Sequence, residues 1–318
     1  MRTGYYSGHL QAADGQAFGF MLTFFRVGLT RPALGAKSAW AAHTVYFAHL
    51  ALTDVQGQKF RFWEKAQRGA LGLAGAATDT LKIWVDDWRA EMQNQEHHLR
   101  AATEDFSLEL TLTPLKPPVL HGQEGYSRKA ARAEVASYYY SLTRLAARGR
   151  LTLAGRTLEV KGTAWLDREF SSAQMAAYQA GWDWFALQLA DGTDLMLYLL
   201  RLRDGGLDPA SGGTLVDPRG RARHLKLSDF MVKVTGTWTS PHTQATYPGA
   251  WEITLPAYGY RLTLIPTLTD QELRTGGSAR LTYWEGQVSI TGTRDGKPLI
   301  GQGYVELTGY AGPLGGRF

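Results

Sequence analysis

Apolar and polar residues alternate along most of this chain, in short runs that end at Gly, Asp or Pro. Residues 4–10 and 17–27 are two such runs, and the Asp14-Gly15 pair between them is a strong signal for a β-hairpin. A period of two places successive side chains on opposite faces of an extended strand. The pattern therefore predicts an all-β protein.

Further strands are predicted at residues 42–53, 59–65, 80–88, 97–102, 106–114, 138–145, 150–153, 157–170, 182–189, 194–203, 214–216, 224–227, 230–238, 250–253, 260–266, 280–291 and 304–308. Residues 128–137 are the best helix candidate, and residues 171–180 read as a loop or helical turn. Short strands joined by hairpins are typical of antiparallel barrels or sandwiches. Because the strand pattern restarts after residue 180, we predict two β-barrel domains packed side by side, residues 1–175 and 176–318.

Length and composition agree with two domains. The 318 residues are about twice a typical domain length. The absence of cysteine excludes disulfides, thiolate nucleophiles and cysteine metal sites. The net charge is +5, but the basic residues are scattered, so we expect no nucleic-acid binding. We expect no signal peptide, because Met1-Arg2 leads straight into strand pattern, and hence a cytoplasmic protein, or a periplasmic or secreted one if a signal peptide was removed.

The most informative stretch is residues 162–170, GTAWLDREF. In a strand, Trp165, Asp167 and Glu169 point one way and Arg168 points the other. Whichever face is buried, an ionisable group is buried with it. Burying such a group costs several kcal/mol unless it is paired or used in chemistry. The stretch is therefore the first candidate for a functional site.

Several motifs along the chain match one known family. They are LTFFR (22–26), FAHLAL (47–52), IWVDDW (83–88), SYYYS (137–141), WLDREF (165–170), GWDWF (181–185), YP (247–248), YWEG (283–286) and GYVELTGY (303–310). On these residues the chain resembles the AttH-like and carotenoid 1,2-hydratase family, whose members carry two lipocalin-like β-barrel domains. The resemblance thus implies the same fold that the alternation predicts.

The resemblance also implies a function. The hydratases add water to a terminal alkene of an acyclic carotenoid, and their acid is an Asp in the matching strand. Asp167 inherits that role here, and Trp165 stands where an aromatic ring would steady the carbocation. This chain has Trp-Leu-Asp-Arg-Glu where the hydratases show a Tyr-x-Asp-His-Asn-like run. Other relatives in the superfamily look like Diels–Alderases, and family association suggests a partner of a membrane transporter.

The substrate expected from this resemblance is a hydrophobic small molecule in or between the barrels. The residues expected to bind it are His49, Arg26, Tyr139, Glu169, Trp182 and Trp184. His49 has an alternative as a hydrogen-bonded core histidine. No metal-ligand spacing appears, and no glycine-rich loop follows a strand and opens a helix, so we expect neither a metal nor a cofactor. We expect Glu285 and Glu306 to pair with arginines.

Two interpretations of Asp167 stay open. Protonating an alkene needs a neutral carboxylic acid in an apolar pocket, where burial raises its pKa and aromatic faces stabilise the resulting cation. Alternatively, Asp167 and Glu169 pair with Arg168 and Arg26, and the guanidinium groups keep the carboxylates ionised. The first interpretation predicts an enzyme, a hydro-lyase or a cyclase. The second fits a lipocalin-like carrier without catalysis.

Overall fold

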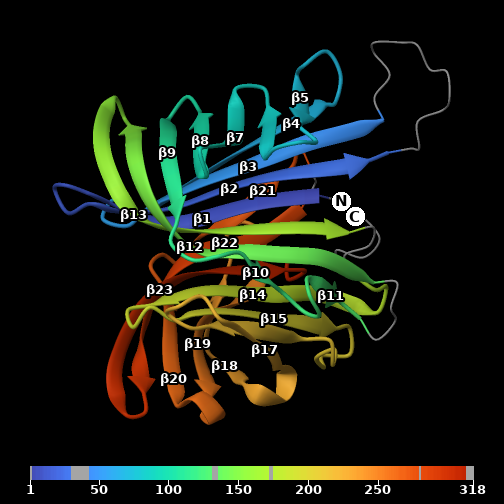
Figure 1. The fold of residues 1–318 in the computed structure, drawn as a ribbon, viewed down its shortest axis with the longest axis vertical. Coiled ribbons are helices and arrows are strands. Elements are labelled where there is room, and N and C mark those ends of the chain that lie inside the picture. Colours follow the sequence, from blue (N-terminus) through green and yellow to red (C-terminus); the bar gives the residue numbers. More distant parts are fainter. Residues whose placement is uncertain (1, 30–42, 131–134, 172–174, 279–280, 313–318) are drawn as a thin grey trace.

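The computed structural model describes residues 2–29, 43–130, 135–171, 175–278 and 281–312 (Figure 1). These residues fold into two antiparallel β-sheets and two single-turn 3-10 helices, η1 (Leu227–Asp229) and η2 (Pro256–Tyr258), with no α-helix among them. None of the helices they form is long and apolar enough to cross a membrane. The prediction of an all-β fold built from two lipocalin-like barrels is confirmed.

The first sheet has thirteen strands, all from the N-terminal half of the chain. They are β1 (Arg2–Ala12), β2 (Ala17–Gly28), β3 (Thr44–Asp54), β4 (Lys59–Arg68), β5 (Ala74–Ala76), β6 (Lys82–Val85), β7 (Trp88–Gln93), β8 (Glu96–Ala102), β9 (Phe106–Pro114), β10 (Val119–Leu120), β11 (Tyr126–Arg128), β12 (Ala136–Leu153) and β13 (Arg156–Ser171). Their order is β4-β3-β2-β1-β13-β12-β9-β8-β7-β6-β5, with β10 and β11 paired to β12.

The second sheet has ten strands, all from the C-terminal half. They are β14 (Gln179–Leu189), β15 (Asp194–Leu202), β16 (Gly212–Val216), β17 (Ala222–Lys226), β18 (Met231–Thr239), β19 (Thr246–Leu255), β20 (Tyr260–Pro266), β21 (Glu272–Thr275), β22 (Leu281–Arg294) and β23 (Lys297–Thr308). Their order is β17-β16-β15-β14-β23-β22-β20-β19-β18, with β21 paired to β22.

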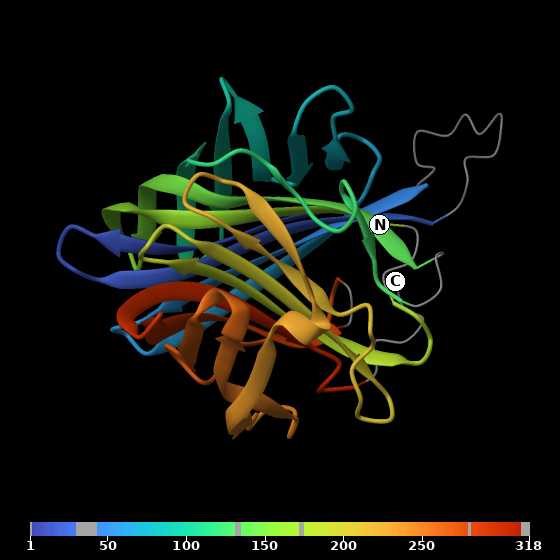
Figure 2. The same ribbon diagram turned by 60° about the horizontal axis from the view of Figure 1, so that its bottom comes forward.

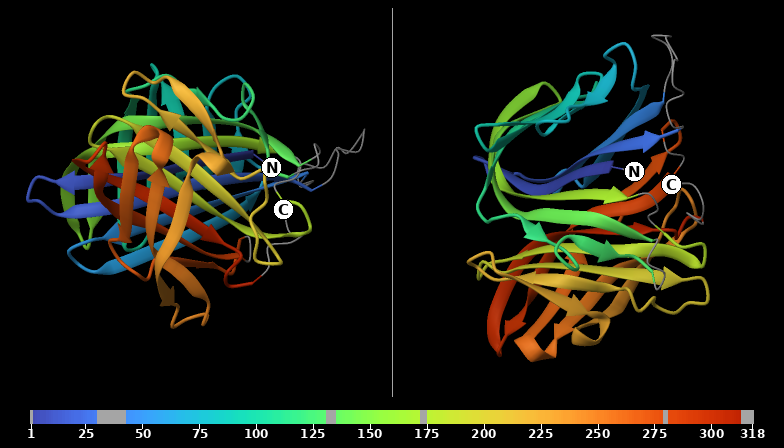
Figure 3. Two further views of the ribbon diagram at one scale, coloured as in Figure 1. Left: turned by 90° about the horizontal axis from the view of Figure 1, so that it is seen from below. Right: turned by 45° about the vertical axis from the view of Figure 1, so that its right-hand side comes forward.

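Both sheets have the same plan. In each, the first strand pairs with the last, β1 with β13 and β14 with β23, and the outer edges of the sheet are strands from the middle of its sequence. Each sheet curls around its own apolar core, which is clearest for the N-terminal sheet in the right panel of Figure 3. The last strand of the first sheet ends at Ser171 and the first strand of the second begins at Gln179, and the domain boundary at residue 175 stays a prediction.

Some local predictions were wrong. The helix predicted over residues 128–137 is absent where the chain is described, because Arg128 ends β11 and Ala136 begins β12; residues 131–134 lie outside the described residues. The strand predicted over residues 80–88 is two strands, because Asp86 adopts a left-handed φ of 54° and turns the chain. The short strands β5, β10, β11 and β21 were not predicted.

The two barrels pack on each other through their outer faces, and a third core lies between them (Figure 2). Side chains of this core include Met21, Trp165, Trp184 and Tyr304. The close approach favours glycine at position 19, because a Cβ there would lie 2.5 Å from the side-chain oxygens of Gln287 and Tyr304, which would have to move. Strands at this junction are thus covered on both faces, one by their own barrel and one by the other barrel.

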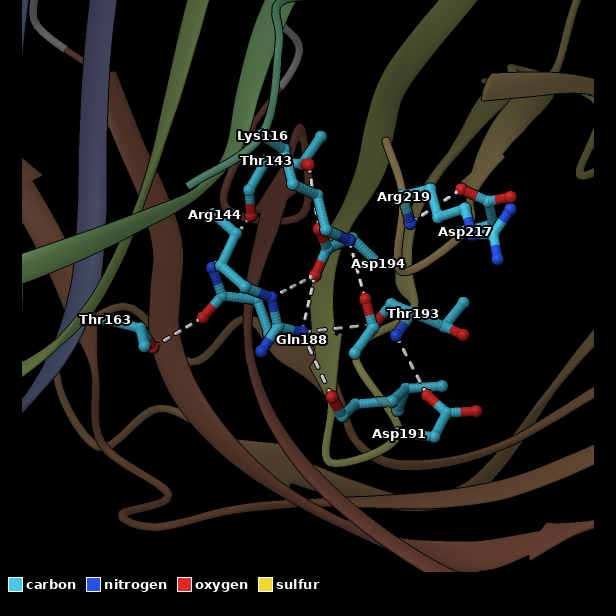
Figure 4. A network of polar contacts seen from close by, with 12 residues as sticks. Lys116, Thr143, Arg144, Thr163, Gln188, Asp191, Thr193, Asp194, Asp217 and Arg219 are labelled. Carbon is cyan, nitrogen blue, oxygen red and sulfur yellow. Dashed lines mark hydrogen bonds and ion pairs between the residues drawn. The ribbon is translucent and has the colours of Figure 1, made fainter. Parts of the chain in front are cut away.

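A buried ion-pair network fixes one end of this junction (Figure 4). Asp194 of β15 is fully buried, and its carboxylate accepts hydrogen bonds from Lys116 Nζ at 2.6 Å, Thr143 Oγ1 at 2.8 Å and Arg144 at 2.6 and 3.0 Å. The pairing of β12 with β13 shifts register between Leu142 and Leu145. Such a bulge re-aims side chains, and here Thr143 and Arg144 both reach the other barrel.

Candidate functional site between the two barrels

A cavity of about 130 Å³ lies in the junction, lined by side chains of both sheets. The lining residues are Tyr5, Thr23, Phe25, Lys129, Tyr139, Asp167, Glu169, Trp182, Trp184, Tyr198, Leu200, Leu281, Tyr283, Glu285, Glu306 and Thr308. Aromatic rings and four carboxyl groups therefore share one space. Neither barrel could form the cavity alone.

Strand register explains the N-terminal wall of the cavity. Asp167 on β13 lies directly opposite Tyr5 on β1 and Ser141 on β12, and Tyr5 lies opposite Thr23 on β2. Directly opposed residues point to the same face of a sheet. One cross-strand row thus carries these four side chains towards the junction, while Arg168 points to the other face, as alternation predicts.

The C-terminal wall is a matching row. Glu285 on β22 is opposite Glu306 on β23, Glu306 is opposite Trp184 on β14, and Trp184 is opposite Tyr198 on β15. Carboxyl groups directly opposite each other repel when both are ionised. Only a structure that brings β22 and β23 together creates this pair.

Hydrogen-bond donors surround Asp167. Its Oδ2 accepts from Tyr139 OH at 2.7 Å, and its Oδ1 accepts from Trp165 Nε1 at 2.7 Å and from the Ser141 hydroxyl. Tyr139 in turn accepts from Trp184 Nε1 at 3.1 Å, which ties the carboxyl to the second barrel. Burial raises the pKa of Asp167 to about 6, although these hydrogen bonds act in the opposite direction.

A buried histidine, His121, is hydrogen-bonded to Ser141, one of the donors to Asp167. His121 Nε2 lies 2.6 Å from Ser141 Oγ, and His121 Nδ1 lies 2.8 Å from Thr214 Oγ1. Because the Ser141 proton is donated to Asp167, His121 donates from Nε2 and accepts at Nδ1. This is a neutral imidazole, in agreement with burial, which lowers the pKa of His121 to about 3.

The cavity contains one ion pair among its lining residues. Lys129 Nζ lies 2.9 Å from Glu169 Oε1, and 4.7 and 4.9 Å from the ring centres of Tyr139 and Tyr198. Ser137 Oγ donates a second hydrogen bond to the same Glu169 oxygen, at 2.6 Å. The Lys129 charge is a main cause of the lowered pKa of Glu169, which burial alone would raise. Glu169 is thus held as a carboxylate.

The carboxyl groups of the other wall behave differently. Glu306 Oε2 accepts from Trp182 Nε1 at 2.9 Å, and burial raises the pKa of Glu306 to about 7. Glu285 is 2% exposed, and its Oε1 has no hydrogen-bond partner. Burial and the nearby Glu306 raise the pKa of Glu285 well above its usual value. Within the described chain neither residue pairs with an arginine, so that expectation was wrong.

The structure places five of the predicted site residues on this cavity: Asp167, Glu169, Tyr139, Trp182 and Trp184. Trp165 lies beside it and reaches it through its bond to Asp167. His49 is fully buried behind the lining residue Tyr283, and its Nδ1 lies 2.7 Å from the Tyr283 hydroxyl. Arg26 lines a different cavity, together with Arg168. The alternative that clamps Asp167 with Arg26 or Arg168 does not describe this site.

Sequence reasoning missed Tyr5, Lys129, Ser141, Tyr198 and Tyr283 as lining or supporting residues. The pairing of β1 and β12 with β13 places Tyr5 and Ser141 opposite Asp167, so knowledge of that register would have indicated both. Lys129 had no such signal, because it follows the short strand β11 in a segment read as helix. Its position depends on the tertiary fold.

The arrangement defines a class: a double-barrel protein of lipocalin-like type with an aromatic, carboxyl-rich pocket at the junction of the barrels. The chain matches the AttH-like family over residues 3–310 and belongs to that family. It is similar to the structure of a provisionally assigned AttH of Nitrosomonas europaea, at 36% identity over 97% of this chain and 92% of that one, with a TM-score of 0.86. No curated protein matches the chain.

Two more distant structures share the fold. Kievitone hydratase from Nectria haematococca is 16% identical over 98% of this chain and 89% of that one, with a TM-score of 0.76. The protein CghA is 12% identical over 98% of this chain and 89% of that one, with a TM-score of 0.54. At these identities the likeness shows the fold and not the chemistry.

Proposed function

We propose that this protein is a hydro-lyase that adds water to the double bond of a small, largely apolar molecule of isoprenoid type, with Asp167 as the acid. One observation carries the proposal: Asp167 lines an aromatic cavity, and its pKa is raised to about 6 with no cation bonded to it. A general acid works best when its pKa is near the working pH. The hydratase among the solved structures with this fold is in line with the proposal.

The chemistry follows from the lining residues. The protonated Asp167 gives its proton to one alkene carbon, and the other carbon becomes a carbocation. The rings of Tyr5, Tyr139 and Trp184 line this space and stabilise the cation. Water adds to the cation, and its extra proton passes to a carboxylate, Asp167 itself or Glu306. The net change is the addition of one water across the double bond.

Cavity size limits the substrate. A water occupies roughly 10–15 Å³ of such space, so about 130 Å³ accommodates on the order of ten non-hydrogen atoms. That is enough for a short isoprenoid or for the end of a longer chain. A carotenoid would therefore place only its end group in the cavity.

Conversion of alkenes in ¹⁸O-labelled water tests the proposal. A panel of short isoprenoid alcohols and prenylated phenols is incubated with the protein, and products that gain one labelled water are sought by mass spectrometry. We expect conversion to slow about tenfold for each pH unit above 6, because the reactive form of Asp167 is the protonated one. Asp167→Asn keeps the shape of the side chain and should lower turnover by at least about 100-fold.

Two controls accompany this experiment. Asp105→Asn alters an exposed loop carboxylate and should leave turnover unchanged. Binding of the same alkenes is measured by quenching of tryptophan fluorescence, since Trp182 and Trp184 line the cavity. If the alkenes bind and none is converted, the protein is a carrier, the second candidate function, for which an aromatic pocket suffices.

A further inference from the structure

A second, smaller cavity lies on the inner side of the N-terminal sheet. Its volume is about 40 Å³, and it is bounded by β1, β2, β13 and the segment from β5 to β6. The lining residues are Gly4, Arg26, Ala76, Ala77, Thr80, Lys82, Ile83 and Arg168. Three of them are cationic and none is acidic. The proposed chemistry at Asp167 uses none of them.

Strand register brings the two arginines together. Arg168 on β13 is opposite Gly4 on β1, and Arg26 on β2 is opposite Arg2, two residues before Gly4. Gly4 has no side chain, so the space above it is open to Arg168, whose NH1 lies 3.6 Å from where a Cβ of residue 4 would be. The guanidinium group of Arg168 also lies 5.3 Å from the ring centre of Phe170. The Arg168 guanidinium group therefore lies over β1, on the side where Arg26 lies.

The charge of these arginines is not balanced by carboxylates of the described chain. The salt bridges found there include neither Arg26 nor Arg168. The Nε atoms of both side chains are buried and have no hydrogen-bond partner. Both side chains are only partly buried, but the Nε–H of each is a buried donor without a partner, which is costly. The exposed Lys82, at the edge of the cavity, lies 3.9 Å from Glu91 in a salt bridge, so the two arginines alone carry the unpaired charge of the lining.

We propose that this cavity binds the carboxylate of a short-chain monocarboxylic acid. A guanidinium group matches a carboxylate with two parallel hydrogen bonds. About 40 Å³ holds roughly three water-sized groups, the size of a carboxylate head. Ala76, Ala77 and Ile83 offer an apolar surface for a short alkyl part. A long chain would have to displace the apolar core beneath, which includes Ile83 and Val85.

Calorimetric titration of the full-length protein with butyrate at low ionic strength tests the assignment. We expect butyrate to bind at least tenfold more tightly than butanol or butylammonium, because only the carboxylate complements the arginines. Inorganic phosphate is the competing oxyanion. If phosphate binds more tightly than butyrate, or if butanol binds equally well, the proposed ligand class is wrong.

Substitutions then locate the site. Arg168→Gln and Arg26→Gln should each weaken butyrate binding at least tenfold. Arg168→Lys should weaken it less, because lysine keeps the positive charge but cannot donate the two parallel hydrogen bonds of a guanidinium group. Arg261→Gln is the matched control, since Arg261 is exposed and pairs with Glu252 on the other barrel. The lysine variant keeps the test valid if a glutamine variant does not fold. Unchanged binding in both glutamine variants, or equal weakening in the control, would overturn the proposal.

Discussion

The interior of the N-terminal barrel and the junction between the barrels are built from opposite faces of the same strands, yet they differ in kind. On β2, Phe20, Leu22 and Phe24 fill the barrel, whereas Met21, Thr23 and Phe25 face the other barrel. The inward set packs into a continuous apolar core. The outward set meets aromatic rings, carboxyl groups and a cavity. Because one face of each strand suffices to stabilise the barrel, the other face is free to carry polar chemistry.

This difference decides where the larger cavity lies. A single lipocalin-like barrel holds its ligand in its own interior, but here apolar side chains of the N-terminal core occupy that space. The larger cavity lies outside both barrels and depends on their packing. Three kinds of substitution distinguish the two regions.

The largest effect should come from breaking the ion-pair network of the junction. Asp194→Ala leaves Lys116 and Arg144 buried without their carboxylate. We expect the free energy of unfolding to fall by about 3–5 kcal/mol, the usual cost of removing one partner of a buried pair. Urea unfolding measures this. As a control, Glu252→Ala breaks an exposed ion pair with Arg261 and should cost less than about 1 kcal/mol.

A leucine-to-alanine comparison separates the two regions by packing. Leu50 is fully buried in the N-terminal barrel, whereas Leu200 borders the junction cavity. We expect Leu50→Ala to cost about 2–5 kcal/mol and Leu200→Ala about 1–2 kcal/mol, because the second side chain already has space on one side. Equal losses in urea unfolding would mean that the junction is packed as tightly as the barrel.

The third effect depends on pH. The pKa of Glu306 rises from 4.5 to about 7 on folding, so the folded state holds this proton more tightly than the unfolded chain does. Below pH 4.5 Glu306 is protonated in both states and does not disfavour folding. As the pH rises from 4.5 to 7, the unfolded chain loses this proton while the folded state retains it, so the free energy of unfolding falls. Glu306→Gln removes that loss. We expect the variant to be more stable than wild type by up to about 3 kcal/mol at pH 8, and equally stable at pH 4.5.

Thermal unfolding at the two pH values measures this difference. Other ionisable groups at the site include Asp167, Glu169, Glu285 and Lys129, and they titrate in both proteins. Comparing the variant with wild type therefore reports Glu306 together with the groups coupled to it, of which Glu285 is one. A variant that is less stable than wild type at pH 8 would show that the cavity stabilises the ionised carboxylate.

The sequence by itself determined the longer strands and the two faces of β13. Alternation is a local property, so it placed Asp167 and Glu169 on one face and Arg168 on the other without knowledge of their neighbours. It determined equally the all-β class. The matching motifs led to Tyr139, Trp182 and Trp184, which line the cavity.

Only the tertiary structure decided what those faces meet. Strand pairing set Ser141 and Tyr5 beside Asp167, and barrel packing brought Trp184 to Tyr139 from the other half of the chain. These contacts join residues 26 to 162 positions apart, and no local pattern specifies them. The pKa of a carboxyl group depends on its surroundings more than on its strand. For that reason the sequence left two roles open for Asp167, an acid in an apolar pocket or a carboxylate paired with arginine. The packing of the two barrels buries Asp167 among hydrogen-bond donors and away from guanidinium groups, which favours the first role.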